Sequence, residues 1–150
     1  MVGKKDKMKI KIIAVGRLKN SPLRDLCDEY IKRLGWPVRI EEIDSPKAAT
    51  AAIEAPLILK HIPENAFVVA LDERGESFSS PAFAEKLSRW RDMAPGNEIV
   101  LLIGGADGFD KSVRGRAKFL LSFGKQTWPH MLVRVMLLEQ IYRAQQILAG

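Results

Sequence analysis

The chain has 150 residues, and a domain of that length buries roughly 70% of the surface that its unfolded chain would expose. Its 24 Lys and Arg residues exceed its 18 Asp and Glu residues, so the formal net charge is +6. This charge favours an anionic partner such as a nucleic acid, but it falls short of the excess typical of a protein that coats one.

Cys27 is the only cysteine, which excludes an internal disulfide and a cysteine-based zinc site and suits a reducing cytoplasm. No run of apolar residues approaches the length of a membrane span, so no membrane partner is expected. Residues 1–7 lack the apolar stretch of a secretory signal and are predicted to be a polar extension.

Strands and helices are predicted to alternate along the rest of the chain. Short apolar or alternating runs indicate strands over residues 8–16, 38–44, 66–72, 98–103 and 118–122. Capping residues and helix-starting prolines indicate helices over residues 21–34, 46–61, 79–93, 110–116 and 129–148. Pro56 is expected to kink or divide the second helix, and residues 73–77 are predicted to form a polar turn. This order predicts an α/β fold with a parallel sheet and helices on both faces.

Ligands of such sheets bind beyond the carboxyl ends of the strands. Three predicted loops lie there: after Leu71, after Ile103, and over residues 123–129. Gly104 and Gly105 would let a ligand approach bare backbone. Taken alone, this glycine loop is equally explained as a tight turn, and its spacing matches neither the dinucleotide fingerprint nor the P-loop.

The last predicted helix carries two polar side chains near its start. His130 is explained equally well as an ordinary polar residue at a helix start. Arg134 has apolar neighbours, so its guanidinium needs a partner, for which Glu139, Asp72 or an RNA phosphate or base are alternatives. Apolar residues on nearly every side of this helix indicate burial against both the sheet and a second subunit.

Two segments, Leu101 to Gly108 (LLIGGADG) and Thr127 to Val135 (TWPHMLVRV), carry a family resemblance. Together with the order of elements, they resemble the RlmH family of SPOUT-type methyltransferases, which methylate the N3 position of a pseudouridine in large-subunit (23S-type) ribosomal RNA. The resemblance covers residues 8–150 and implies one methyltransferase domain, a homodimer and a carboxyl-terminal trefoil knot that binds S-adenosylmethionine. Without it, sequence physics would predict an unknotted sheet.

The resemblance also implies site residues. The S-adenosylmethionine site is expected at Leu71, Gly104, Gly105, Phe123, Gly124, Lys125, Gln126, Thr127 and Trp128. Their backbone groups would bind the polar edge of adenine while apolar side chains cover its faces. His130 and Arg134 are the catalytic candidates, because the imide proton at N3 must leave. No metal is expected, since two histidines and one cysteine offer no ligand cluster.

RNA or an assembled ribosome is expected to contact basic residues around the pocket, although each alone is equally explained as surface charge: Arg17, Lys19, Arg114, Arg116, Lys118 and Lys125. Two other functions fit the sequence: a non-catalytic RNA-binding or ribosome-assembly module, and a small nucleotide-binding domain with a phosphate loop at residues 104–108. Family members continue into a short tail with a His-Pro-Tyr-His or similar pattern, whereas this sequence ends at Ala149-Gly150. The cofactor site is expected to be complete without that tail.

Overall fold

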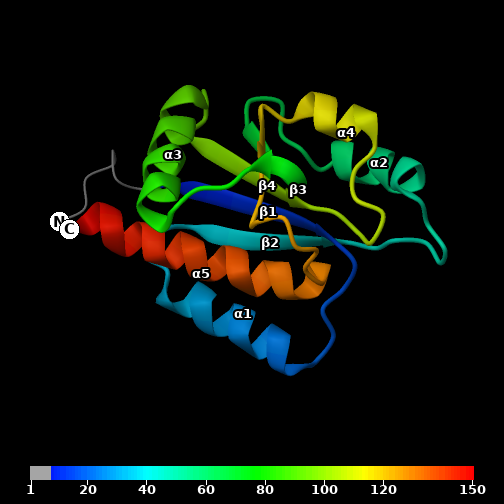
Figure 1. Ribbon diagram of the computed structural model, residues 1–150, viewed down its shortest axis with the longest axis horizontal. Coiled ribbons are helices and arrows are strands. Elements are labelled where there is room, and N and C mark those ends of the chain that lie inside the picture. Colours follow the sequence, from blue (N-terminus) through cyan, green and yellow to red (C-terminus); the bar gives the residue numbers. More distant parts are fainter. Residues whose placement is uncertain (1–7) are drawn as a thin grey trace.

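The computed structural model describes residues 8–150, and the expected polar extension over residues 1–7 lies outside the described residues. Five strands form its centre: β1 (Lys9–Val15), β2 (Val38–Ile43), β3 (Phe67–Glu76), β4 (Glu98–Ile103) and β5 (Phe119–Leu121) (Figure 1). The helices between and after them are α1 (Pro22–Arg33), α2 (Ala51–Leu59), α3 (Ser80–Met93), α4 (Lys111–Arg116) and α5 (His130–Ala149).

The strands form one sheet in the order β2-β1-β4-β3-β5, and every neighbouring pair is parallel. Side chains alternate along β1, so that Ile10 and Ile12 pack in a core with α1, α3 and α5, whereas Ile13 and Val15 pack in a second core with α2 and α4. Figure 1 shows α1 and α5 on one side of the strands and α2 and α4 on the other. The predicted α/β fold is confirmed, and the knot stays a prediction.

Three helices begin at the predicted capping residues. The side chains of Ser21, Ser79 and Asp110 each accept a hydrogen bond from a backbone amide in the first helical turn. Such a cap satisfies a donor that the helix itself leaves unpaired and typically stabilises a helix by about 1 kcal/mol. These local signals explain why α1, α3 and α4 begin where the sequence predicts.

The second helix differs from its prediction. It begins at Ala51, after the capping residue Thr50, and continues through Pro56 to Leu59 as one segment. The prediction that Pro56 divides this helix is therefore wrong, and a kink at Pro56 stays a prediction. Proline removes one backbone donor from the helix, and burial of Ala55 and Ile58 against the sheet offsets that loss.

The third strand is longer than predicted, because the expected polar turn at residues 73–77 belongs largely to β3. Leu71 and Glu76 both pair with Leu121, so residues 72–75 leave the ladder as a bulge. Gly75 presses against β5, where a Cβ atom would lie 2.8 Å from the amide nitrogen of Leu121. Only glycine fits there, because any side chain would meet the backbone of β5.

Candidate functional site

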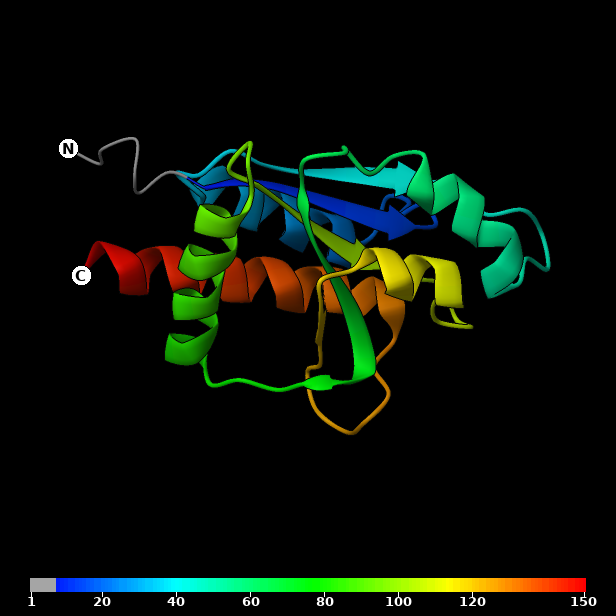
Figure 2. The same ribbon diagram turned by 90° about the horizontal axis from the view of Figure 1, so that it is seen from above.

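A cavity of about 660 Å³ lies at the carboxyl ends of β3, β4 and β5. Its wall comes from the β3 bulge, the glycine loop after β4, the loop after β5 and the start of α5. Figure 2 shows the end of β3 and the loop before α5 side by side. The volume falls within the range of small-molecule sites, and all three loops expected to bind a ligand contribute to it.

Most of the predicted cofactor residues share this cavity. Those that line it are Leu71, Gly104, Gly105, Phe123, Gly124, Gln126, Thr127 and Trp128. Lys125 is exposed and does not line it. His130 also lines the cavity, whereas Arg134 does not.

The loop after β5 is held by its own hydrogen bonds. The Ser122 hydroxyl donates to the Gly124 carbonyl at 2.9 Å and accepts from the Gly124 amide at 3.1 Å. Gly124 has φ +110°, a conformation that other residues rarely adopt. The Thr127 hydroxyl donates to Glu73 at 3.2 Å and thereby joins this loop to the β3 bulge.

The glycine loop after β4 folds back on itself, with the Gly108 amide donating to the Gly105 carbonyl at 3.1 Å. A Cβ at Gly104 would lie 3.1 Å from the Gly108 carbonyl oxygen, and one at Gly105 would lie 2.9 Å from Oε2 of Glu54. The prediction that these glycines leave backbone bare for a ligand is therefore incomplete. They also make room for the loop itself and for a buried carboxylate.

Glu54 supports the glycine loop from α2 and is only 5% exposed. Its Oε2 accepts a hydrogen bond from the Ser45 hydroxyl at 2.7 Å, while Oε1 has no partner within the described residues. A buried carboxylate oxygen without a hydrogen-bond partner costs folding free energy.

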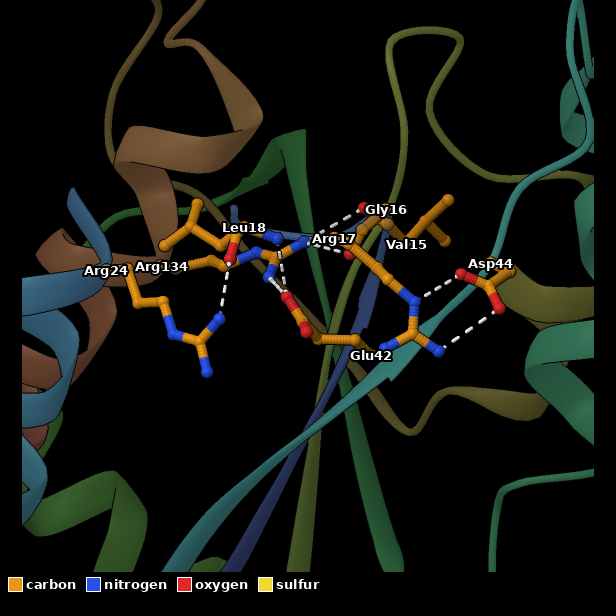
Figure 3. Close-up of polar contacts among 8 residues, drawn as sticks. All are labelled: Val15, Gly16, Arg17, Leu18, Arg24, Glu42, Asp44 and Arg134. Carbon is orange, nitrogen blue, oxygen red and sulfur yellow. Dashed lines mark hydrogen bonds and ion pairs between the residues drawn. The ribbon is translucent and has the colours of Figure 1, made fainter. Parts of the chain in front are cut away.

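Arg134 lies under the loop that follows β1 (Figure 3). It is 1% exposed, and its guanidinium donates to Oε2 of Glu42 at 2.7 Å and to the carbonyls of Val15 and Gly16 at 3.1 and 2.7 Å. Through these contacts Arg134 attaches α5 to the carboxyl ends of β1 and β2. Of the two predicted catalytic side chains, only His130 therefore reaches the cavity.

Neither side-chain partner considered for Arg134 is the one found. Glu139 instead accepts from Arg143, and Asp72 from Arg74. The actual partner, Glu42, lies on β2, far away in the sequence. Burial alone would raise the pKa of Glu42, but hydrogen bonds from the Leu18 amide and from Arg134 outweigh it, so the pKa lies below its ordinary value.

The sequence prediction missed Arg74 and considered Asp72 only as a partner of Arg134. In the β3 bulge, Nε and Nη2 of Arg74 donate to the two carboxylate oxygens of Asp72 at 3.1 and 3.0 Å. These bonds hold the pKa of Asp72 below its ordinary value, although burial acts in the opposite direction. Both residues line the cavity. An acidic and a basic residue directly after an apolar strand were a usable signal, which the assignment of a polar turn obscured.

Two kinds of site are not found in residues 8–150. No three His, Cys, Asp or Glu side chains there are grouped so that they could hold a metal ion. No helix in the same range combines the length and the apolar character that crossing a bilayer requires.

A family model described as "Predicted SPOUT methyltransferase" matches residues 8–150. The chain belongs to the SPOUT methyltransferase family. This SPOUT methyltransferase is 52% identical over 147 residues to the "Ribosomal RNA large subunit methyltransferase H" of Rhodospirillum centenum, with 95% of this chain and 96% of that protein covered. Proteins of the same name from Ruegeria sp. and Roseobacter denitrificans are 48% identical over 151 residues, with the same coverage. The family resemblance predicted from two short segments is confirmed.

Proposed function

We propose that this SPOUT methyltransferase transfers a methyl group from S-adenosylmethionine to the N3 position of a pseudouridine in large-subunit ribosomal RNA. The observation that carries the proposal is the cavity where three strand-end loops meet, in a chain about half identical to proteins named for methylation of this RNA. On this proposal the protein acts in the cytoplasm and needs no metal.

The residues around the cavity fit S-adenosylmethionine. Leu71, Ile103 and Val133 supply apolar surface for the faces of an adenine ring, and the loops supply backbone N–H and C=O groups for its polar edge. When bound, this cofactor supplies a methyl group that is already activated by a sulfonium. The protein must then align the acceptor nitrogen with the methyl group and control one proton.

His130 is the side chain proposed to handle that proton. It lines the cavity from the first residue of α5, where an imidazole nitrogen can accept the N3 proton or a ring N–H can stabilise the developing anion. Arg134 is proposed as a positioning residue, because its bonds to Glu42 and to the loop after β1 fix the start of α5. Attachment of this helix determines the direction in which His130 enters the cavity.

We also propose that the protein acts as a homodimer through α5. One side of this helix is buried against the sheet by Leu137, Leu138 and Ile141. On the other side, Leu132 and Met136 are only half-buried although both are large apolar residues. A second copy would cover this surface and bring two copies of α5 together about a two-fold axis.

Calorimetry with S-adenosylmethionine, ATP and NAD, followed by tritium transfer from labelled methyl donor to ribosomes and to pseudouridine-containing RNA, tests the proposal. Selective binding of the methyl donor and transfer to RNA are expected. Preferential binding of ATP would favour a nucleotide-binding domain. Binding of the donor without transfer to any RNA would favour a non-catalytic RNA-binding or ribosome-assembly module.

A further inference from the structure

The β3 bulge holds one arginine at the mouth of the cavity. Arg74 lines the cavity with 61% of its side chain exposed, and Asp72, with 7% exposed, fixes it through two hydrogen bonds. Those bonds use Nε and Nη2, so the Nη1 amino group keeps its hydrogen-bonding capacity. The fork of a guanidinium that is already oriented loses little conformational entropy when it binds an anion.

A second arginine reaches the same cavity from α4. Nη1 of Arg114 donates to the Phe109 carbonyl at 2.5 Å, which leaves Nε and Nη2 without partners in the described residues. No carboxylate in residues 8–150 forms an ion pair with Arg114. Asp72 and Asp110 lie near enough to interact electrostatically with Arg114, but neither takes up its Nε and Nη2 donors.

Three carboxylates also line the cavity, and none of them occupies the remaining donors of the two arginines. Asp72 is bound by Arg74, and Glu73 accepts from Thr127. Asp107 also lines the cavity and forms no hydrogen bond or ion pair in the described part of the chain. Two guanidinium groups with uncommitted donors line this cavity, and a guanidinium can bind a phosphate group through paired N–H bonds.

We propose that Arg74 and Arg114 form a phosphate clamp that holds the RNA backbone next to the target nucleotide. The clamp rests on the proposed function. Arg114 is one of the six basic residues expected to contact RNA, whereas Arg74 was not among them. S-Adenosylmethionine carries no phosphate, and the exposed position of Arg74 can be reached by a macromolecule. A base that enters the cavity leaves its flanking phosphates near the cavity lining, to which both arginines belong.

Three variants, Arg74→Gln, Arg114→Gln and the double substitution, test the clamp. Arg89→Gln is the matched control, because Arg89 pairs with Glu85 on the surface of α3 and does not line the cavity. Tritium transfer from S-adenosylmethionine to ribosomes gives KM for the RNA substrate and kcat, and calorimetry gives the affinity for the methyl donor. Each single variant is expected to raise KM about tenfold with little change in kcat or donor affinity.

The salt dependence separates a phosphate contact from a structural role. The logarithm of kcat/KM should fall less steeply with the logarithm of salt concentration, by about 0.7 for each lost contact, and by about twice that in the double variant. Arg74→Lys and Arg114→Lys keep the positive charge and should therefore show the wild-type salt slope. Their KM should lie between those of the wild type and the Gln variants, because lysine lacks the paired N–H donors of a guanidinium. Arg89→Gln should match the wild type in every measurement.

An unchanged salt slope in folded Gln variants, with the wild type active on RNA, would overturn the clamp and leave the proposed function standing. Weaker binding of the methyl donor at unchanged KM for RNA would assign the two arginines to the donor's carboxylate and also overturn the clamp. If a Gln variant fails to fold, the corresponding Lys variant decides. A wild-type salt slope with a raised KM for RNA in that Lys variant supports the clamp, whereas a wild-type KM in it overturns the clamp. A wild type that methylates no RNA overturns the clamp and the proposed function together.

Discussion

Arg134 and Glu42 lie 92 residues apart in the sequence, and Nη1 of Arg134 donates to Oε2 of Glu42 at 2.7 Å. This contact joins the first turns of α5 to the end of β2. Gly16 completes the joint with φ +93°, and a Cβ there would lie 3.0 Å from the Met131 side chain. The start of α5 therefore carries both this joint and His130, which lines the cavity.

Breaking this pair should destabilise the protein strongly. Glu42→Gln leaves the buried Arg134 guanidinium without its countercharge, and loss of one partner of a buried pair costs about 3–5 kcal/mol of the free energy of unfolding. Urea unfolding measures this change. Asp44→Asn is the control, because the Arg17–Asp44 pair is exposed and screened by solvent, so its loss should change stability little. Equal effects of the two substitutions would contradict the assignment.

The same pair should make stability depend on acid pH. The folded-state pKa of Glu42 lies below the ordinary value of 4.5, so its contribution is complete above that value and is lost as the pH falls through the lower folded-state pKa. Urea midpoints from about pH 6 to about pH 3 should fall less steeply in Glu42→Gln than in the wild type. Parallel curves for the two proteins would show that Glu42 does not titrate in this way.

Gly75→Ala should disrupt the β3 bulge. The added Cβ meets the Leu120–Leu121 peptide of β5, and overpacking of this kind costs about 1–3 kcal/mol. Because the bulge carries Arg74 and Asp72, methyl transfer to RNA should fall as well. Gly115→Ala in α4 is the control, since nothing lies within 4 Å of its Cβ position. Thermal unfolding and tritium transfer measure both effects, and a Gly75→Ala protein identical to this control would refute the prediction.

Gly105→Ala should weaken binding of the methyl donor, because the new Cβ pushes the glycine loop away from the Glu54 carboxylate. Glu54→Ala removes the atoms that would clash. The double variant should therefore bind S-adenosylmethionine better than the sum of the two single changes predicts, by a coupling of about 0.5–3 kcal/mol in calorimetry. Strict additivity would mean that Glu54 does not limit the position of this loop.

Met136→Glu should dissociate the proposed dimer, since a charge on the half-buried side of α5 appears twice at a two-fold interface. Light scattering at micromolar concentration is expected to give a dimer for the wild type and a monomer for the variant. Glu85→Gln on the surface of α3 serves as the control and should stay dimeric. A monomeric wild type would exclude this interface.

The sequence by itself determined most elements, because their signals are local. A capping hydroxyl such as Ser79 satisfies a backbone donor three residues away, and an apolar run such as Glu98–Ile103 needs only burial to become a strand. The loops expected to bind a ligand were also predictable, since the carboxyl ends of parallel strands meet at one edge. His130 and the glycine loop followed from that rule together with the family resemblance.

Only the tertiary structure decided the contacts between distant segments. Arg134 needed a countercharge, but nothing near it in the sequence identifies Glu42, which the parallel sheet brings under α5. The β3 bulge depends on Gly75 meeting β5, and the same pairing converts an expected turn into the support of Arg74. Such contacts depend on how the strands are ordered and packed. That order is selected by packing energies summed over the whole core, so no single segment of the sequence is enough to predict the contacts.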